Sequence, residues 1–180
     1  TRLVLDALQV TDFGIYALVG GVVAMLGFIT NALLITTQRY ISFYQGKQDY
    51  NYVKKVFSNS LFLHILFSTI IALVLLLLKF WLFDGILNIP SERISTAKDV
   101  YVITVIMLVI TILIAPFKAL FIARENIVYV SVVEICDGII KLLMAIGLSY
   151  VSSDRLIIYA IMMTSIQLLN LFVFAGFANW

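Results

Sequence analysis

The segment Tyr129–Tyr150 most constrains how this chain can fold, because it has the length and apolar character of a membrane-spanning helix but carries charges in its middle. Glu134, Asp137 and Lys141 recur at helical spacing. At about 100° per residue they fall within an arc of roughly 60° on one face. A charge at the centre of a bilayer costs about 2.5 kcal/mol or more. The pattern therefore predicts that this face borders a protein-lined, wet interior that holds a polar molecule.

The composition indicates an integral membrane protein. The 180 residues are 63% hydrophobic and 12% charged, whereas a soluble domain is about half apolar and about a quarter charged. The net charge of +2 is too small to indicate nucleic-acid binding. Cys136 is the single cysteine and His64 the single histidine. The sequence therefore predicts no intrachain disulfide, metal centre or cofactor, and we interpret Cys136 as a small apolar helix residue and His64 as a helix-packing residue.

Apolar stretches predict an all-α integral membrane chain with about six transmembrane helices. Most of them are long enough to cross a hydrocarbon core of about 30 Å. The first is expected to lack its beginning, so the chain is interpreted as a fragment of a longer transporter. We treat residues 1–180 as one transmembrane domain, and the expected helices are 1–9 (partial), 13–37, 56–83, 100–117, 127–150 and 156–180.

Local signals between these helices predict turns and loops. Val10–Asp12 is expected to turn, and Arg39–Lys55, which is basic and rich in tyrosine, to form a loop at the headgroup region. Pro116 is expected to bend or end the fourth helix. No Gly-rich phosphate loop, metal-ligand spacing or nucleophile–base pair is present in the sequence, so we predict that the chain is not an enzyme.

One stripe of the second predicted helix consists of small residues and an amide. They recur at steps of four, three and four, at Gly20, Ala24, Gly27 and Asn31. Small residues on one stripe let two membrane helices approach closely. Asn31 either hydrogen-bonds to such a neighbour or lines a cavity.

The distribution of Lys and Arg predicts the orientation in the membrane. The connections after the second and fourth helices hold four and two basic residues, whereas those after the third and fifth hold two and one. The first pair is therefore expected in the cytoplasm, with the N-terminus on the same side. Lys118 and Arg124, in the second of these connections, are interpreted as topology determinants.

Three stretches carry a resemblance to a known family. They are Leu8 with Asp12–Tyr16 between the first two helices, Gln38–Arg39 at the end of the second, and Ala123–Asn126 before the fifth. With these stretches, essentially the whole sequence resembles the polysaccharide-unit (Wzx-type) flippases of bacterial envelopes. These flippases are relatives of the multidrug and toxic-compound extruders (MATE proteins) and of the lipid II flippases. Gln9 stands where the family usually has Gly, so we expect a slightly different turn there.

The resemblance implies a longer chain with two pseudo-symmetric, MATE-like lobes that alternate access, of which these residues form the N-terminal lobe. The implied cargo is an oligosaccharide on undecaprenyl pyrophosphate, moved across the bacterial inner membrane for surface polysaccharide or O-antigen synthesis. The implied partners are this lipid-linked oligosaccharide, membrane lipids, and the polysaccharide polymerase and export machinery. Transport in the family is thought to be coupled to an ion gradient.

The resemblance implies roles for the charged residues in the predicted helices. Cations would hold the pyrophosphate, and the candidate lumen-lining residues are Arg2, Asp6, Asn31, Arg39 and Lys141. Arg2 and Asp6 are four residues apart and can pair along one helix face, as can Asp137 and Lys141. A carboxylate in a low-dielectric interior takes up a proton readily unless a cation lies beside it. Glu134 and Asp137 are therefore the candidates for H⁺ or Na⁺ coupling.

Other interpretations stay open. Arg39 is also typical of a positive-inside anchor, and the charged set on the fifth helix can be a purely structural network. The main alternative function is a cation-coupled multidrug or metabolite antiporter, in which the acidic residues matter and the cations do not. A membrane-embedded glycosyltransferase is disfavoured because such enzymes usually place their acidic motifs in surface loops. A non-transporting scaffold subunit would need no charges at depth.

Overall fold

The computed structural model describes residues 2–87, 89–150 and 154–178, without the side chains of residues 2, 3, 84 and 86. These residues form helices and connecting turns, with no strand among them. The helices are α1 (Arg2–Ala24), α2 (Gly27–Gly46), α3 (Tyr50–Trp81), η1 (Leu82–Ile86), η2 (Ser91–Arg93), α4 (Ile94–Ala123), α5 (Ile127–Gly147), η3 (Leu148–Tyr150) and α6 (Arg155–Gly176).

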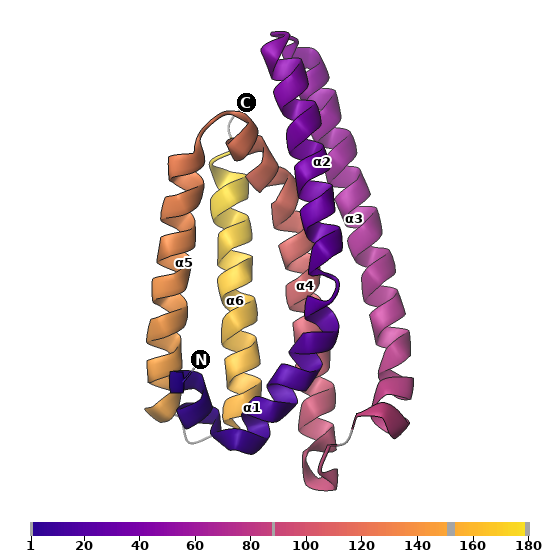
Figure 1. Ribbon diagram of the computed structural model, residues 1–180, viewed down its shortest axis with the longest axis vertical. Coiled ribbons are helices and arrows are strands. Elements are labelled where there is room, and N and C mark those ends of the chain that lie inside the picture. Colours follow the sequence, from indigo (N-terminus) through magenta and orange to yellow (C-terminus); the bar gives the residue numbers. More distant parts are fainter. Residues whose placement is uncertain (1, 88, 151–153, 179–180) are drawn as a thin grey trace.

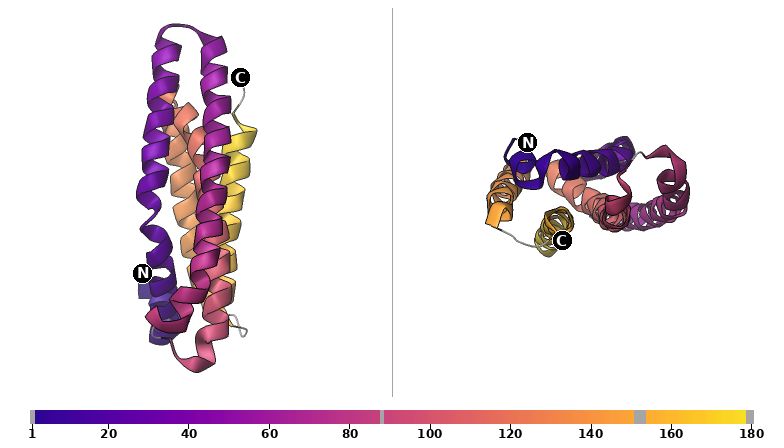
Figure 2. Two further views of the ribbon diagram at one scale, coloured as in Figure 1. Left: turned by 90° about the vertical axis from the view of Figure 1, so that its right-hand side faces the viewer. Right: turned by 90° about the horizontal axis from the view of Figure 1, so that it is seen from below.

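The helix α4 is the central element of the bundle. It contacts α1, α2, α3, α5 and α6, and Figures 1 and 2 show the long helices running along one common axis around it. Its sequence is apolar on every side, which is typical of a helix surrounded by protein. Val100, Tyr101 and Ala119 have no exposed surface.

The outer faces of the bundle are apolar, and this indicates a membrane protein. On α3, Phe62, Leu77 and Phe80 are between 65% and 73% exposed, an arrangement that is unfavourable in water and suited to lipid. Four segments are long and apolar enough to cross a membrane, and they are Val4–Ala24, Tyr50–Trp81, Ser91–Ala123 and Arg155–Gly176. The prediction of an all-α chain agrees with these elements, whereas the number of six spans stays a prediction.

The helix α1 contains a sharp bend at Gln9. Gln9 has φ 66° and ψ 166°, whereas its neighbours are helical. Figure 1 shows the piece before the bend beside α5 and the piece after it rising toward α2. The turn predicted at Val10–Asp12 is therefore realised one residue earlier, at the position where the resembled family usually has Gly.

The helix predicted over 13–37 is interrupted in the structure. The chain turns at Met25–Leu26, and the next helix begins at Gly27. Two glycines, Gly20 and Gly21, precede this break, and glycine is the weakest helix former apart from proline. The apolar pattern runs on through the break, so it could not reveal where the helix ends.

The loop predicted over Arg39–Lys55 is mostly helical, which corrects that prediction. The helix α2 continues to Gly46 and α3 begins at Tyr50, so the two form a hairpin that extends beyond the other helices (Figure 1). Gln48 adopts φ 57°, and Gln48 N and Asp49 N donate to Gln45 O and Tyr44 O at 2.9 and 3.1 Å. This left-handed cap ends α2. A polar stretch can be a loop or a helix that continues outside the bilayer, and polarity alone does not distinguish the two.

The fourth helix is longer than the predicted 100–117. It begins at Ile94 and continues through the buried Pro116 to Ala123, so Pro116 does not end it. Proline is tolerated inside membrane helices when neighbouring helices enclose it, and α4 is enclosed in this way. The other predicted segments, 56–83, 127–150 and 156–180, shift at their ends, and residues 151–153 and 179–180 lie outside the described part.

We predict that Gln9→Gly stabilises the protein by about 1 kcal/mol, because the backbone conformation of Gln9 is essentially restricted to glycine and costs other residues about 1–3 kcal/mol. Thermal unfolding in detergent measures the effect. The matched control is Gln38→Gly inside α2, where glycine should cost about 0.5–1 kcal/mol. A fall in unfolding temperature for both variants would contradict the strain at Gln9.

Candidate functional site

The charged stripe of α5 forms ion pairs with its own helix and with two neighbouring helices. Lys141 Nζ lies 2.6 Å from Asp137 Oδ2, which confirms the pair predicted from their spacing. Asn170 Nδ2 of α6 donates to Asp137 Oδ1 at 2.7 Å. Glu134 pairs with Lys118 of α4. The pairs therefore connect α5 to both α4 and α6.

The four charges in this cluster cancel. Lys118 and Lys141 each have a carboxylate partner, and the side chain of Asp137 is only 18% exposed. Removing one member of a buried pair leaves an uncompensated charge, which concerns Asp137 and Lys141, whereas the side chain of Glu134 is 57% exposed. Lys118 was interpreted from the sequence as a topology determinant, but in the structure it points to an acidic partner on α5.

A cavity of about 230 Å³ lies beside this cluster, and we call it the ionic cavity. Four helices contribute to its lining. The polar side chains of the lining are Thr30, Asn31, Thr111, Lys118, Glu134, Asp137, Gln167 and Asn170. Polar groups that line a cavity in a helical membrane bundle typically mark a water-filled pathway or a binding site.

Two neighbouring cavities extend the ionic cavity along the same side of α4. One, of about 420 Å³, is lined by Tyr16, Lys141 and Tyr159 among others. The other, of about 530 Å³, is lined by residues of α1, α2 and α4 and again includes Tyr16. Gln167 lines all three cavities. We call these three cavities together the polar groove.

The structure brings together some of the residues that the sequence singled out. Asn31 lines two of the cavities, and Lys141 lines a third. Asp6 and Arg39 are exposed and are not among the residues that line the groove. The side chain of Arg2 lies outside the described part, and so does its predicted pairing with Asp6.

Sequence reasoning missed Lys118, Thr30 and Tyr16 as groove residues. Gln167 and Asn170 were visible as polar residues on one face of an apolar helix, which was the available signal for both. Nothing in the spacing along the chain connects Lys118 on α4 with Glu134 on α5. Within the ranges 2–87, 89–150 and 154–178, no group of three or more His, Cys, Asp or Glu could hold a metal ion.

His64 belongs to a separate polar network between α2 and α3. Its ring is 1% exposed, and its Nδ1 lies 2.7 Å from the carbonyl oxygen of Ser60. The hydroxyl of Ser60 lies 2.5 Å from that of Thr37 on α2. This position agrees with the interpretation of His64 as a helix-packing residue.

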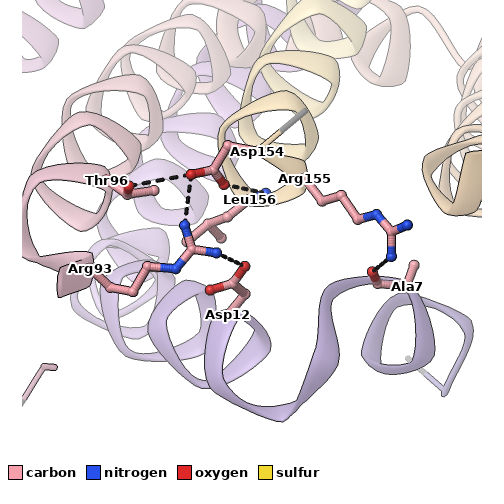
Figure 3. Close-up of polar contacts among 7 residues, drawn as sticks. All are labelled: Ala7, Asp12, Arg93, Thr96, Asp154, Arg155 and Leu156. Carbon is pink, nitrogen blue, oxygen red and sulfur yellow. Dashed lines mark hydrogen bonds and ion pairs between the residues drawn. The ribbon is translucent and has the colours of Figure 1, made fainter. Parts of the chain in front are cut away.

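An ionic clamp of Arg93, Asp12 and Asp154 ties three helices together at one end of the groove. Figure 3 shows the guanidinium of Arg93 between the two carboxylates, with Nη2 lying 2.6 Å from Asp12 and Nη1 lying 2.7 Å from Asp154. Asp154 also accepts a hydrogen bond at 3.2 Å from Leu156 N and so caps α6. The clamp therefore fixes the bent helix α1 against the starts of α4 and α6.

A second contact supports the bend itself. Arg155 Nη1 donates to the carbonyl oxygen of Ala7 at 3.1 Å (Figure 3). Ala7 lies in the short piece of α1 that precedes Gln9, so α6 holds this piece in place. Together with the clamp, the contact positions Tyr16 in the lining of the groove. Its ring lies edge to face with that of Tyr159, with 4.9 Å between the ring centroids.

We predict that Arg93→Ala destabilises the protein by about 2 kcal/mol, because Asp12 and Asp154 are then left close together without a cation. The value lies below that for a fully buried pair because the side chain of Arg93 is 34% exposed and solvent screens it. Thermal unfolding measures the loss, and Glu92→Gln, an exposed neighbour, is the control. Equal unfolding temperatures for Arg93→Ala and the wild type would show that the clamp does not hold the bundle.

Comparison with protein-family models, with curated proteins and with solved structures finds no match to this chain.

Proposed function

We propose that this chain forms one lobe of a membrane transporter and that a polar cargo passes along the polar groove. The ionic cavity carries this proposal, because two ion pairs and an amide line a cavity in a bundle whose outer faces are apolar. Polar and charged groups are expensive at such depth. A scaffold subunit would have no use for them, whereas a transporter needs a polar path.

The cargo that we propose is an oligosaccharide linked to a polyprenyl pyrophosphate, which moves between the leaflets of the bacterial inner membrane. The resemblance of the sequence to polysaccharide-unit flippases supports this cargo class. Such a cargo needs a polar path for its sugar while its tail stays among lipids. The amides and hydroxyls of Asn31, Gln167 and Thr30 supply hydrogen-bonding groups along that path.

The proposed role of the charged residues changes with the geometry. The sequence suggested that Lys141 holds the pyrophosphate, but Lys141 is already paired with Asp137 at 2.6 Å. We therefore assign Asp137 and Glu134 to ion coupling. A proton or Na⁺ that binds either carboxylate competes with its lysine partner, and this exchange changes the contacts between α5, α4 and α6.

A cation-coupled antiporter of small molecules is the second candidate. The observation that favours it is the position of Asp137 in a cavity of about 230 Å³ that also contains neutral oxygen ligands, because carboxylate and carbonyl oxygens suit hard cations. In that case the same carboxylates would drive the efflux of a drug or metabolite, and polysaccharide would be unaffected.

The double variant Asp137→Asn/Lys141→Gln tests the proposal in the native gene of the host. It removes both charges together, so no unpaired charge remains to unfold the bundle. We expect export of surface polysaccharide to fall about tenfold or more, which corresponds to roughly 1.4 kcal/mol on the limiting step. Lipid-linked oligosaccharide should accumulate in the inner leaflet, and immunoblots of membranes check insertion.

The matched control is Glu92→Gln/Lys98→Gln, which removes one acid and one base outside the groove and should leave export normal. Normal export by Asp137→Asn/Lys141→Gln would contradict the role of the ionic cavity. If the same double variant loses drug resistance while surface polysaccharide stays normal, the cargo is a drug or metabolite, as in the antiporter.

A further inference from the structure

The cavity of about 530 Å³ has no charged residue in its lining, and we call it the neutral part of the polar groove. It is lined by small residues of α1 and α2 and by hydroxyl and amide side chains. The charged residues that line the other two cavities are paired with one another, Lys118 with Glu134 and Lys141 with Asp137. Within the described residues, the groove therefore offers no unpaired lysine or arginine to an anionic ligand, and an uncharged ligand fits it better.

Thr30 is a hydroxyl without a partner in this neutral part. Its side chain lines two of the cavities, the residue is 9% exposed, and its Oγ1 has no hydrogen-bond partner in the described part of the chain. Other helical threonines donate to the carbonyl four residues earlier at 2.7–2.9 Å, namely Thr36, Thr37, Thr104, Thr111 and Thr164. A buried polar group without a partner costs free energy, so Thr30 is suited to a ligand that supplies one.

Gln167 and Asn31 provide free amides to the neutral part from two different helices. Gln167 comes from α6 and Asn31 from α2, and no hydrogen bond joins either to another residue that the structure describes. Each amide offers both a donor and an acceptor. This combination matches a hydroxyl group, which also donates and accepts.

An aromatic side chain and open space complete the neutral part. The ring of Tyr16 lines the neutral part as well as the cavity of about 420 Å³, and it supplies an apolar face with a polar tip. At Gly20, a Cβ atom would meet no neighbouring atom within 4 Å. The space beside Gly20, Ala24 and Gly27 can therefore hold a ring-sized group against α1.

From these contacts we infer that Tyr16, Thr30, Asn31 and Gln167 form the recognition site for the uncharged, hydroxyl-rich part of the cargo. The site binds sugar rings through the amides and the hydroxyl of Thr30, with the ring of Tyr16 against their C–H faces. The pyrophosphate stays outside this site. This inference rests on the proposed function and adds the residues that select the sugar.

Binding to the native protein in nanodiscs tests the inference. The two probes are the lipid-linked oligosaccharide extracted from the host membranes and polyprenyl pyrophosphate without sugar. We expect the wild type to bind the sugar-bearing lipid more tightly. Gln167→Leu and Thr30→Val should each weaken that binding about fivefold, as expected for one lost hydrogen bond, and leave the sugar-free lipid unaffected.

A steric variant and two controls make the result decisive. Gly20→Leu projects a side chain into the neutral part from a position where a Cβ meets no atom within 4 Å, and it should also weaken binding of the sugar-bearing lipid only. Asn59→Leu and Thr69→Val remove an amide and a hydroxyl from exposed positions on α3 and should bind both lipids like the wild type. Unfolding temperatures identify any variant that fails to fold. If Gln167→Leu does not fold, the binding measured with Gly20→Leu takes its place as the test.

The inference would be overturned if Gln167→Leu, Thr30→Val and Gly20→Leu all bind the sugar-bearing lipid as tightly as the wild type does. That result would leave the proposed function intact. Equally weakened binding of both lipids would also overturn it, because the site would then hold the polyprenyl pyrophosphate and not the sugar. If the wild type binds neither lipid, the proposed function fails and the inference fails with it.

Discussion

The structure depends on how charges are neutralised inside an apolar bundle. Asp137 is the central residue, because its two oxygens accept from Lys141 on its own helix and from Asn170 on α6. The pair of Glu134 with Lys118 adds a link to α4. The half-buried Asp137, whose side chain is 18% exposed, would be costly as an unpaired charge. Together the paired residues hold α5 against its neighbours and line the cavity that we assign to transport.

The rest of the bundle keeps the groove in shape. The apolar helix α4 supplies one wall, and the ionic clamp of Arg93, Asp12 and Asp154 fixes α1 across its end. The bend at Gln9 turns the second piece of α1 toward α2, so that Tyr16 reaches the groove. Apolar packing therefore positions the helices, and the ion pairs add fixed contacts between α1, α4, α5 and α6.

Local patterns in the sequence predicted much of this arrangement but few of its long-range contacts. The period of Glu134, Asp137 and Lys141 predicted one polar face on α5, and the four-residue spacing predicted the Asp137–Lys141 pair. The break at Met25–Leu26 and the helical hairpin around Gln48 were not predicted, because apolar runs and polar runs are each compatible with helix or turn. The contacts of Lys118 and Arg93 depend on which helices are neighbours, and spacing along one chain does not contain that information.

Labelling with a charged, membrane-impermeant thiol reagent tests most directly whether the groove contains water. In a Cys136→Ser background, Gln167→Cys places a thiol in the groove, and Leu77→Cys places one on the lipid-facing side of α3, where Leu77 is 73% exposed. Thiols react as thiolates, which form in water and not in lipid. With reagent on both sides of the membrane, we expect rapid labelling of Gln167→Cys and none of Leu77→Cys. A Gln167→Cys thiol as unreactive as that of Leu77→Cys would contradict a groove that contains water.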